Sequence, residues 1–156
     1  MKIRKAMDKD IPMFLELLTQ VNMVHHNGRP DLFKGPAQKY TEDELKELFR
    51  NPGAAVFSAV DNDDNVLGYA ICFQEITEEG NLRTGIRTLY LDDLCVDEAA
   101  RRQHVGGQLY KHVVSYAREN GYYNVTLHVW ECNPSAEQFY RHQGMQVQYT
   151  CMEEIV

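Results

Sequence analysis

The stretch that decides the fold runs from Ile86 to Gly144: IRTLYLDDLCVDEAARRQHVGGQLYKHVVSYARENGYYNVTLHVWECNPSAEQFYRHQG. Residues 88–96 are rich in Leu, Tyr and Val, a composition typical of a largely buried strand. Residues 125–130 alternate between apolar and polar side chains and predict a second strand. A helical pattern follows each of them, so the stretch predicts the order strand, helix, strand, helix.

The first of these helices begins at a pair of glycines, Gly106-Gly107, and carries apolar residues at helical spacing from Leu109 to Ala117. Free N–H groups and the positive end of the helix dipole favour a phosphate at such a start, and glycine lets the ligand approach the backbone. Arg101-Arg102 adds positive charge just upstream. The pattern indicates a pyrophosphate site, although two glycines alone would fit a simple turn equally well.

The second helix begins at Asn133-Pro134-Ser135, where Asn or Ser suits the N-cap and Pro suits the first helical position. Its sequence carries Ala136 and the aromatic pair Phe139-Tyr140 before Gly144.

With these two motifs, in this order and at this separation, the chain resembles the GNAT acetyltransferases (GCN5-related N-acetyltransferases). The phosphate-binding pattern of that family is Arg or Gln, two residues, Gly, one residue, then Gly or Ala. Arg101 and Gly106 match it, and His104 stands where the family usually has Gly. The second motif is matched by Asn133, Ala136, Phe139-Tyr140 and Gly144-Met145.

The resemblance implies an α/β (α+β) GNAT fold: a single mixed, mostly antiparallel central sheet of six to seven strands, flanked by about four helices. We expect one such domain over residues 1–156. The remaining segments agree with this architecture. Strand-like runs lie at 2–7, 54–60, 66–76 and 145–152, and helical patterns lie at 11–23 and 41–49. Residues 25–36 have the Gly and Pro content of a loop.

The resemblance also implies that acetyl-CoA is the co-substrate. Arg101, Arg102 and the backbone of 103–107 would hold its pyrophosphate, and its pantetheine arm would add to the central strand like a further strand. The cofactor-binding residues implied in this way are Leu94, Cys95, Val96, Arg101, Arg102, Gln103, His104, Val105, Gly106, Gly107, Asn133 and Ser135.

Tyr140 lies where the family places its general acid, the phenol that protonates the leaving thiolate. The alternative is that Phe139-Tyr140 only packs the helix. Asp92 and Asp93 interrupt an apolar strand, and side chains alternate along a strand, so we expect only one of them to face the acceptor. We give Asp92 the acceptor role, with a water chain as the alternative base. Asp93 would then be structural, and it is otherwise a further candidate for contact with the acceptor.

Three residues of the loop at 25–36 are candidates for contact with the acceptor: Arg29, Asp31 and Phe33. Adjacent His25-His26 suggests a metal only weakly, because no third ligand is nearby, and no metal is expected. A covalent acetyl-cysteine at Cys95 or Cys132 is conceivable. Neither has a basic neighbour in the motif, so direct transfer is favoured.

The bulk properties set further limits. A chain of 156 residues with 44% hydrophobic content suits one domain. A net charge of -7 argues against nucleic acid or an anionic membrane as partner and is compatible with a cationic substrate. No leader or apolar run of ~20 residues is visible, so we expect a cytoplasmic protein. The four cysteines form no CxxC pair and are expected to be reduced thiols.

We therefore expect an N-acetyltransferase that passes an acetyl group from acetyl-CoA to a primary amine of a small molecule, a polyamine or amino compound, by direct attack in a ternary complex. Protein or peptide amines are an alternative acceptor, and a catalytically silent acyl-CoA sensor is an alternative function. A Rossmann-type nucleotide module is a weaker reading, because its glycines would follow the first strand. A homodimer is possible, as in relatives.

Overall fold

The computed structural model describes all 156 residues, and five of its segments form one mixed sheet in the order β1-β2-β3-β4-β5. The pairs β1/β2, β2/β3 and β3/β4 are antiparallel, whereas β4/β5 is parallel. The strands are β1 (Lys2–Lys5), β2 (Ala54–Val60), β3 (Val66–Thr77), β4 (Ile86–Val96) and β5 (Asn124–Thr126).

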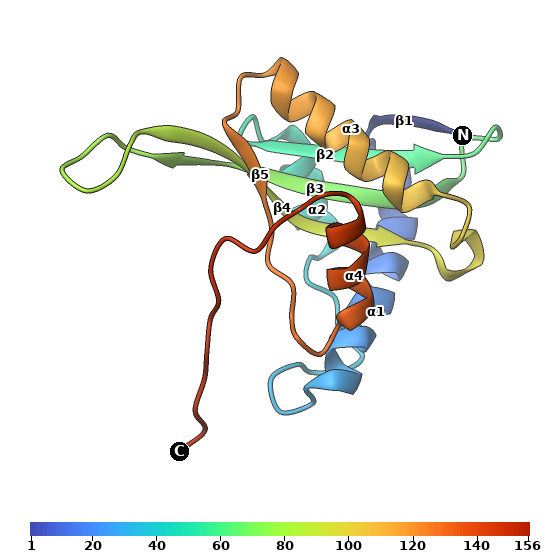
Figure 1. Ribbon diagram of the computed structural model, residues 1–156. Helices are drawn as coiled ribbons and strands as arrows, with labels where there is room; N and C mark the ends of the chain where they lie inside the picture. The colour runs from blue at the N-terminus through green and yellow to red at the C-terminus, as the bar shows by residue number, and fades with distance from the viewer.

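Four α-helices pack around this sheet (Figure 1). They are α1 (Ile11–Gly28), α2 (Glu42–Arg50), α3 (Val105–Glu119) and α4 (Pro134–His142), with short 3₁₀ turns η1 (Asp8–Asp10) and η2 (Glu98–Ala100). The core lies in two clusters. Leu109 and Val113 of α3 pack with Leu89 on one face of the sheet, and Phe14 of α1 packs with Leu45 of α2 on the other. The fold is the expected α/β arrangement of a mixed sheet between helices.

Local signals explain where the helices begin. Thr41 caps α2: its hydroxyl accepts from the Glu44 N–H at 3.3 Å, and the Glu44 carboxylate accepts from the Thr41 N–H at 2.7 Å. Helix α1 begins with Pro12 in its first turn. No helix in the structure is both long enough and apolar enough to span a membrane.

The expectation that the loop begins at residue 25 was wrong, because α1 continues to Gly28. The His25 and His26 side chains meet the returning chain and so extend the helix. His26 Nδ1 lies 2.7 Å from the Phe33 carbonyl, and the His25 ring packs 5.1 Å from the Phe33 ring.

The expected last strand at 145–152 is not formed, so the sheet has five strands instead of six or seven. The segment alternates like a strand but pairs with no other strand. Met145 donates the last backbone hydrogen bond of the chain, and Val147 and Tyr149 are 61% and 63% exposed. This tail leaves α4 and runs away from the sheet (Figure 1). The strand expected at 125–130 is also shortened, with only Asn124–Thr126 paired to β4.

Candidate functional site

A β-bulge in strand β4 brings two carboxyl groups to one face of the sheet. Ile71 of β3 pairs with Asp93 and Cys72 pairs with Leu91, so Asp92 is the extra residue. Leu91 packs in the cluster beneath α3. Both aspartates contact tyrosines that belong to the α1/α2 side. The expectation that only one of them faces that side was therefore wrong, because the bulge breaks the alternation.

Asp92 is engaged by the loop that precedes α2. Lys39 Nζ lies 2.7 Å from each carboxylate oxygen, and the Tyr40 hydroxyl donates to the same group at 3.1 Å. The Asp92 side chain is 12% exposed, whereas that of Lys39 is 49% exposed. The Asp92 carboxylate is therefore held in a mostly buried position, and the Lys39 ammonium group approaches it from the solvent side.

Asp93 has a single side-chain partner, the hydroxyl of Tyr69, at 2.9 Å. Burial raises the pKa of Asp93 to about 6, and the Tyr69 hydrogen bond and the Lys39 charge oppose that rise only in part. A carboxyl group with this pKa can exchange a proton near neutral pH.

Tyr140 on α4 packs against Phe139 of its own helix and Tyr110 of α3. Its ring is 5.0 Å from that of Phe139 and 6.0 Å from that of Tyr110. Burial, and after it the charge of Asp93, raises the pKa of Tyr140 well above its usual value. The phenol is therefore protonated at neutral pH, as a proton donor must be.

The turn between β4 and α3 has an unusual backbone. Arg102 and His104 both adopt positive φ, 60° and 62°, and His104 is the residue that precedes the first turn of α3. Only glycine adopts this left-handed region without strain. The geometry gives a physical reason for the glycine that the family usually has at this position, and it shows that histidine follows the same path.

The start of α3 offers unpaired donors. The first backbone bond of the helix runs from Gln108 to His104, so the N–H groups of Val105, Gly106 and Gly107 donate to no protein atom, and no side chain caps the end. Arg101 lies nearby and is 50% exposed in its pair with Glu98. Such a cradle fits a pyrophosphate.

The main chain of β4 is open beside this cradle. β5 pairs with β4 only at Thr88, Leu89 and Tyr90, so the β5-facing edge of Leu94–Val96 has no strand neighbour. An extended ligand arm could hydrogen-bond there as a strand does.

Asn133 acts as the N-cap of α4. Its Oδ1 accepts from the Ala136 N–H at 3.2 Å and from the Ser135 hydroxyl at 2.9 Å. The capping role expected from the sequence is confirmed. Phe139 of the same helix contacts the donor cradle, since a Cβ on Gly106 would lie 3.5 Å from its ring.

Of the three loop candidates, Arg29 and Asp31 pair with each other at 2.8 Å, and Arg29 also pairs with Glu153. Their charges are therefore largely matched within the protein. Phe33 packs edge-on against Trp130 at 5.1 Å.

Several polar and aromatic residues of this region were missed by sequence reasoning. Tyr90 lies two residues before Asp92, and its hydroxyl is 3.1 Å from His128 Nδ1, while His128 Nε2 is 2.7 Å from the Tyr149 hydroxyl. The spacing of Tyr90 from Asp92 was a usable signal. Nothing in the local sequence points to Lys39 or Tyr40.

The Cys95 thiol shows no sign of activation as a nucleophile. Cys95 points away from the cradle and donates to the Leu17 carbonyl at 3.6 Å, and burial raises its pKa to about 12. No group of three or more His, Cys, Asp or Glu side chains is placed to hold a metal ion.

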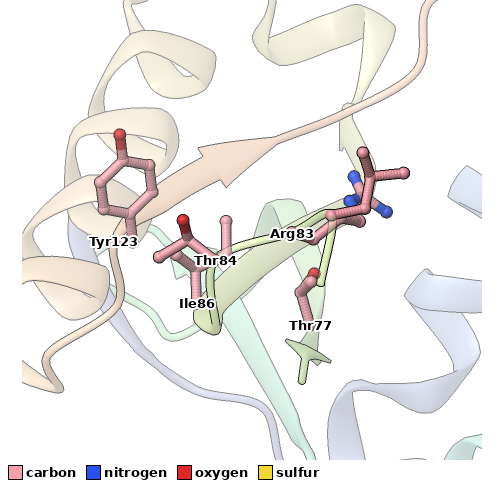
Figure 2. Close-up of a pocket in the computed structure, with 6 residues that line it drawn as sticks. Thr77, Arg83, Thr84, Ile86 and Tyr123 are labelled. Carbon is pink, nitrogen blue, oxygen red and sulfur yellow. The ribbon is translucent and has the colours of Figure 1, made fainter. Parts of the chain in front are cut away.

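A separate hollow lies at the end of the β3–β4 hairpin (Figure 2). Its lining includes Thr77, Arg83, Ile86 and Tyr123. Ile86 is six residues before Asp92 on β4, which corresponds to about 20 Å along the strand. The hollow is therefore distant from the carboxylates and the cradle.

Comparison with known proteins agrees with this geometry. The family model described as the acetyltransferase (GNAT) family matches residues 22–145. The chain is 33% identical over 75 residues to GCN5-related N-acetyltransferase 6, chloroplastic, of Arabidopsis thaliana, a match that covers 48% of the chain. The match spans only 25% of that longer protein.

Solved structures share the whole architecture. A mutant of the BH1408 protein from Bacillus halodurans has a TM-score of 0.96 and 26% identity, with 100% of this chain and 99% of that chain covered. An aminoglycoside acetyltransferase from an uncultured soil sample, solved with sisomicin, has a TM-score of 0.71 and 19% identity, with 99% and 95% covered. At that identity the likeness shows the fold alone.

Proposed function

Because the chain belongs to the GNAT acetyltransferase family, we propose that it transfers the acetyl group of acetyl-CoA to a primary amine of a small molecule, such as a polyamine or another amino compound. The observation that carries this proposal is the placement of two carboxyl groups, Asp92 and Asp93, at the bulge of β4. They lie on the strand whose open edge leads to the free N–H groups of α3.

The donor would be held by the main chain and by two arginines. The N–H groups of Val105–Gly107 and the charges of Arg101 and Arg102 would bind the pyrophosphate. The backbone of Leu94–Val96 would align the pantetheine arm, and an N–H in that segment would polarise the thioester carbonyl. Ser135 would contact the donor from α4, next to the capping residue Asn133.

The acceptor amine would be attracted and deprotonated at Asp92, or through the chain from Tyr90 to His128, and would attack the carbonyl directly. Tyr140 would donate its proton to the departing thiolate. A route through acetyl-cysteine is less well supported, because the Cys95 thiol is buried and its raised pKa keeps it protonated. Phe33 would form part of the acceptor wall with Trp130.

The test is release of coenzyme A in the presence of a panel of amines: a diamine, a polyamine, an amino sugar and a lysine peptide. Turnover of a small amine supports the proposal. Turnover of the peptide alone would favour a protein acetyltransferase. Thermal stabilisation by acetyl-CoA with no turnover of any amine would favour an acyl-CoA sensor over an enzyme.

The possible homodimer is also a proposal. Its support is the alternating tail at 145–152, whose backbone makes no hydrogen bond after Met145, and the free outer edge of β5. If the tail of one copy pairs with the sheet of another, light scattering will give a dimer that deletion of residues 146–156 converts to a monomer. A monomer before deletion would remove the idea.

A further inference from the structure

We propose that Lys39 is itself an acceptor: in the absence of substrate, its side chain occupies the amine position at Asp92 and becomes acetylated. The inference rests on the proposed function of the same site. Lys39 carries the chemical group expected of the substrate, a primary ammonium on a flexible alkyl chain, and its Nζ lies 2.7 Å from both oxygens of the carboxylate.

The contacts of Lys39 distinguish it from the other paired lysines. Lys46 binds Glu42 and Asp43 on the outer face of its own helix, and Lys9 binds Asp64 in a surface turn. Only Lys39 pairs with a carboxylate of β4, the strand that also carries the open edge proposed for the acetyl donor.

Lys39 lies among residues of the site, and its pairing with Asp92 differs in this from an ordinary surface ion pair. The Lys39 charge also acts on Asp93, where it partly opposes the burial that raises the pKa of that carboxyl group. The pKa of His25 is lowered first by burial and then by the Lys39 charge. The lysine lies in the segment between α1 and α2, and its side chain is 49% exposed. It can therefore leave Asp92 when an external amine arrives.

The reaction balances with acetyl-CoA as the only co-reactant. One proton of the Lys39 ammonium passes to Asp92, and the neutral amine attacks the acetyl carbon. The N–C bond forms and the C–S bond breaks, with the electron pair leaving on sulfur. The thiolate takes the Tyr140 proton, and the second proton of the amine is lost as the amide forms and restores the phenol. The products are acetyl-lysine, coenzyme A and one released proton.

The experiment incubates the intact protein with acetyl-CoA and no amine and follows acetylation of each lysine by peptide mass spectrometry. Lys46 is the matched control within the same chain, because it is also ion-paired and partly exposed. We expect Lys39 to be acetylated at least ~10-fold faster than Lys46, and Tyr140→Phe to slow Lys39 alone. The rate should be independent of protein concentration, as for an intramolecular step.

A second variant tests the competition with substrate. Lys39→Gln removes the ammonium that blocks Asp92, so we expect a several-fold lower KM for a turned-over amine. Acetylation of Lys39 no faster than that of Lys46, while external amines are turned over, would overturn the inference and leave the proposed function standing. If no amine is turned over and no lysine is acetylated, both fail.

Discussion

The hydroxyl of Tyr69 donates a hydrogen bond of 2.9 Å to Asp93, and it is the only side chain that does so. Tyr69 is fully buried and stacks on Phe14 of α1 at 4.6 Å, so the phenol cannot move away from the carboxyl group. One neutral donor does not offset the burial of a carboxylate. Burial therefore raises the pKa of Asp93 to about 6, and the Tyr69 hydrogen bond opposes that rise only in part.

The raised pKa makes the stability of the protein depend on pH. The folded state holds the Asp93 proton between the unfolded pKa, ~4, and the folded value of about 6. The stabilisation is fully present below pH ~4 and is lost as pH rises through 6. We therefore expect Asp93→Asn to match the wild type near pH ~4 and to exceed it by about 2–3 kcal/mol at pH ~8.

Urea unfolding at a series of pH values measures this difference. Asp63→Asn is the control, because Asp63 lies exposed in the turn between β2 and β3. A difference between Asp93→Asn and wild type that stays constant with pH would show that Asp93 does not titrate in this range.

Tyr140→Phe removes the hydroxyl proposed as the proton donor but keeps the ring packed against Tyr110 and Phe139. We expect turnover to fall by roughly 10²-fold or more, with little change in the affinity for acetyl-CoA. Steady-state kinetics and calorimetric titration with coenzyme A separate the two effects. Tyr110→Phe changes a tyrosine at the same aromatic contact, and we expect it to leave turnover within about 2-fold of the wild-type value. Equal losses in both variants would assign Tyr140 to packing.

Asp92→Asn keeps the size of the side chain and removes its charge. Because the amide cannot attract an ammonium group, we expect the KM for the amine to rise by about 10-fold or more, with a fall in kcat if Asp92 is also the base. The kinetics of a turned-over amine give both constants. A normal kcat would assign deprotonation to the path through Tyr90 and His128, and unchanged values of both constants would remove Asp92 from the acceptor site.

These sites differ in how far the sequence could predict them. The start of α3 at the glycines and the Asn133 cap depend on residues next to each other in the chain, so spacing located them. The bulge at Asp92 depends on the register between β3 and β4, and its partner Lys39 is 53 positions distant. No local pattern encodes such a pairing.

The tail at 145–152 is a case in which a clear local pattern predicted a strand that does not form. Alternation of Met145, Val147 and Tyr149 predicted a strand, but a strand also has to pair with an edge, and this segment pairs with none. Periodicity records which face of a segment is apolar. It does not record which neighbour covers that face.

His104→Gly tests the cost of the left-handed backbone in the turn before α3. Relief of a non-glycine residue at φ 62° should stabilise the protein by about 1 kcal/mol. Gln103→Gly is the matched control: its φ is not positive, so the same substitution should destabilise by ~0.5–1 kcal/mol. Thermal unfolding compares the two. A lower stability for His104→Gly than for Gln103→Gly would mean that the His104 side chain has a contact role that outweighs the strain.

We expect the stability of the protein to depend on Asp10, which is 2% exposed at the start of α1. Its carboxylate accepts from Arg4 at 2.7 and 2.9 Å, from the Ser58 hydroxyl at 2.8 Å and from the Met7 N–H at 3.0 Å. Asp10→Ala leaves the buried Ser58 hydroxyl without its partner and leaves the Arg4 guanidinium with only the more exposed Asp64 as a charged partner, so we expect a loss of about 2–3 kcal/mol. Asp8→Ala removes an exposed pair with Arg50 and should cost at most ~1 kcal/mol. Because α1 carries the Leu17 carbonyl that Cys95 contacts, the Asp10 variant should also weaken the packing of β4. Denaturant unfolding of the two variants decides the matter: similar losses would mean that Asp10 contributes no more than a surface charge.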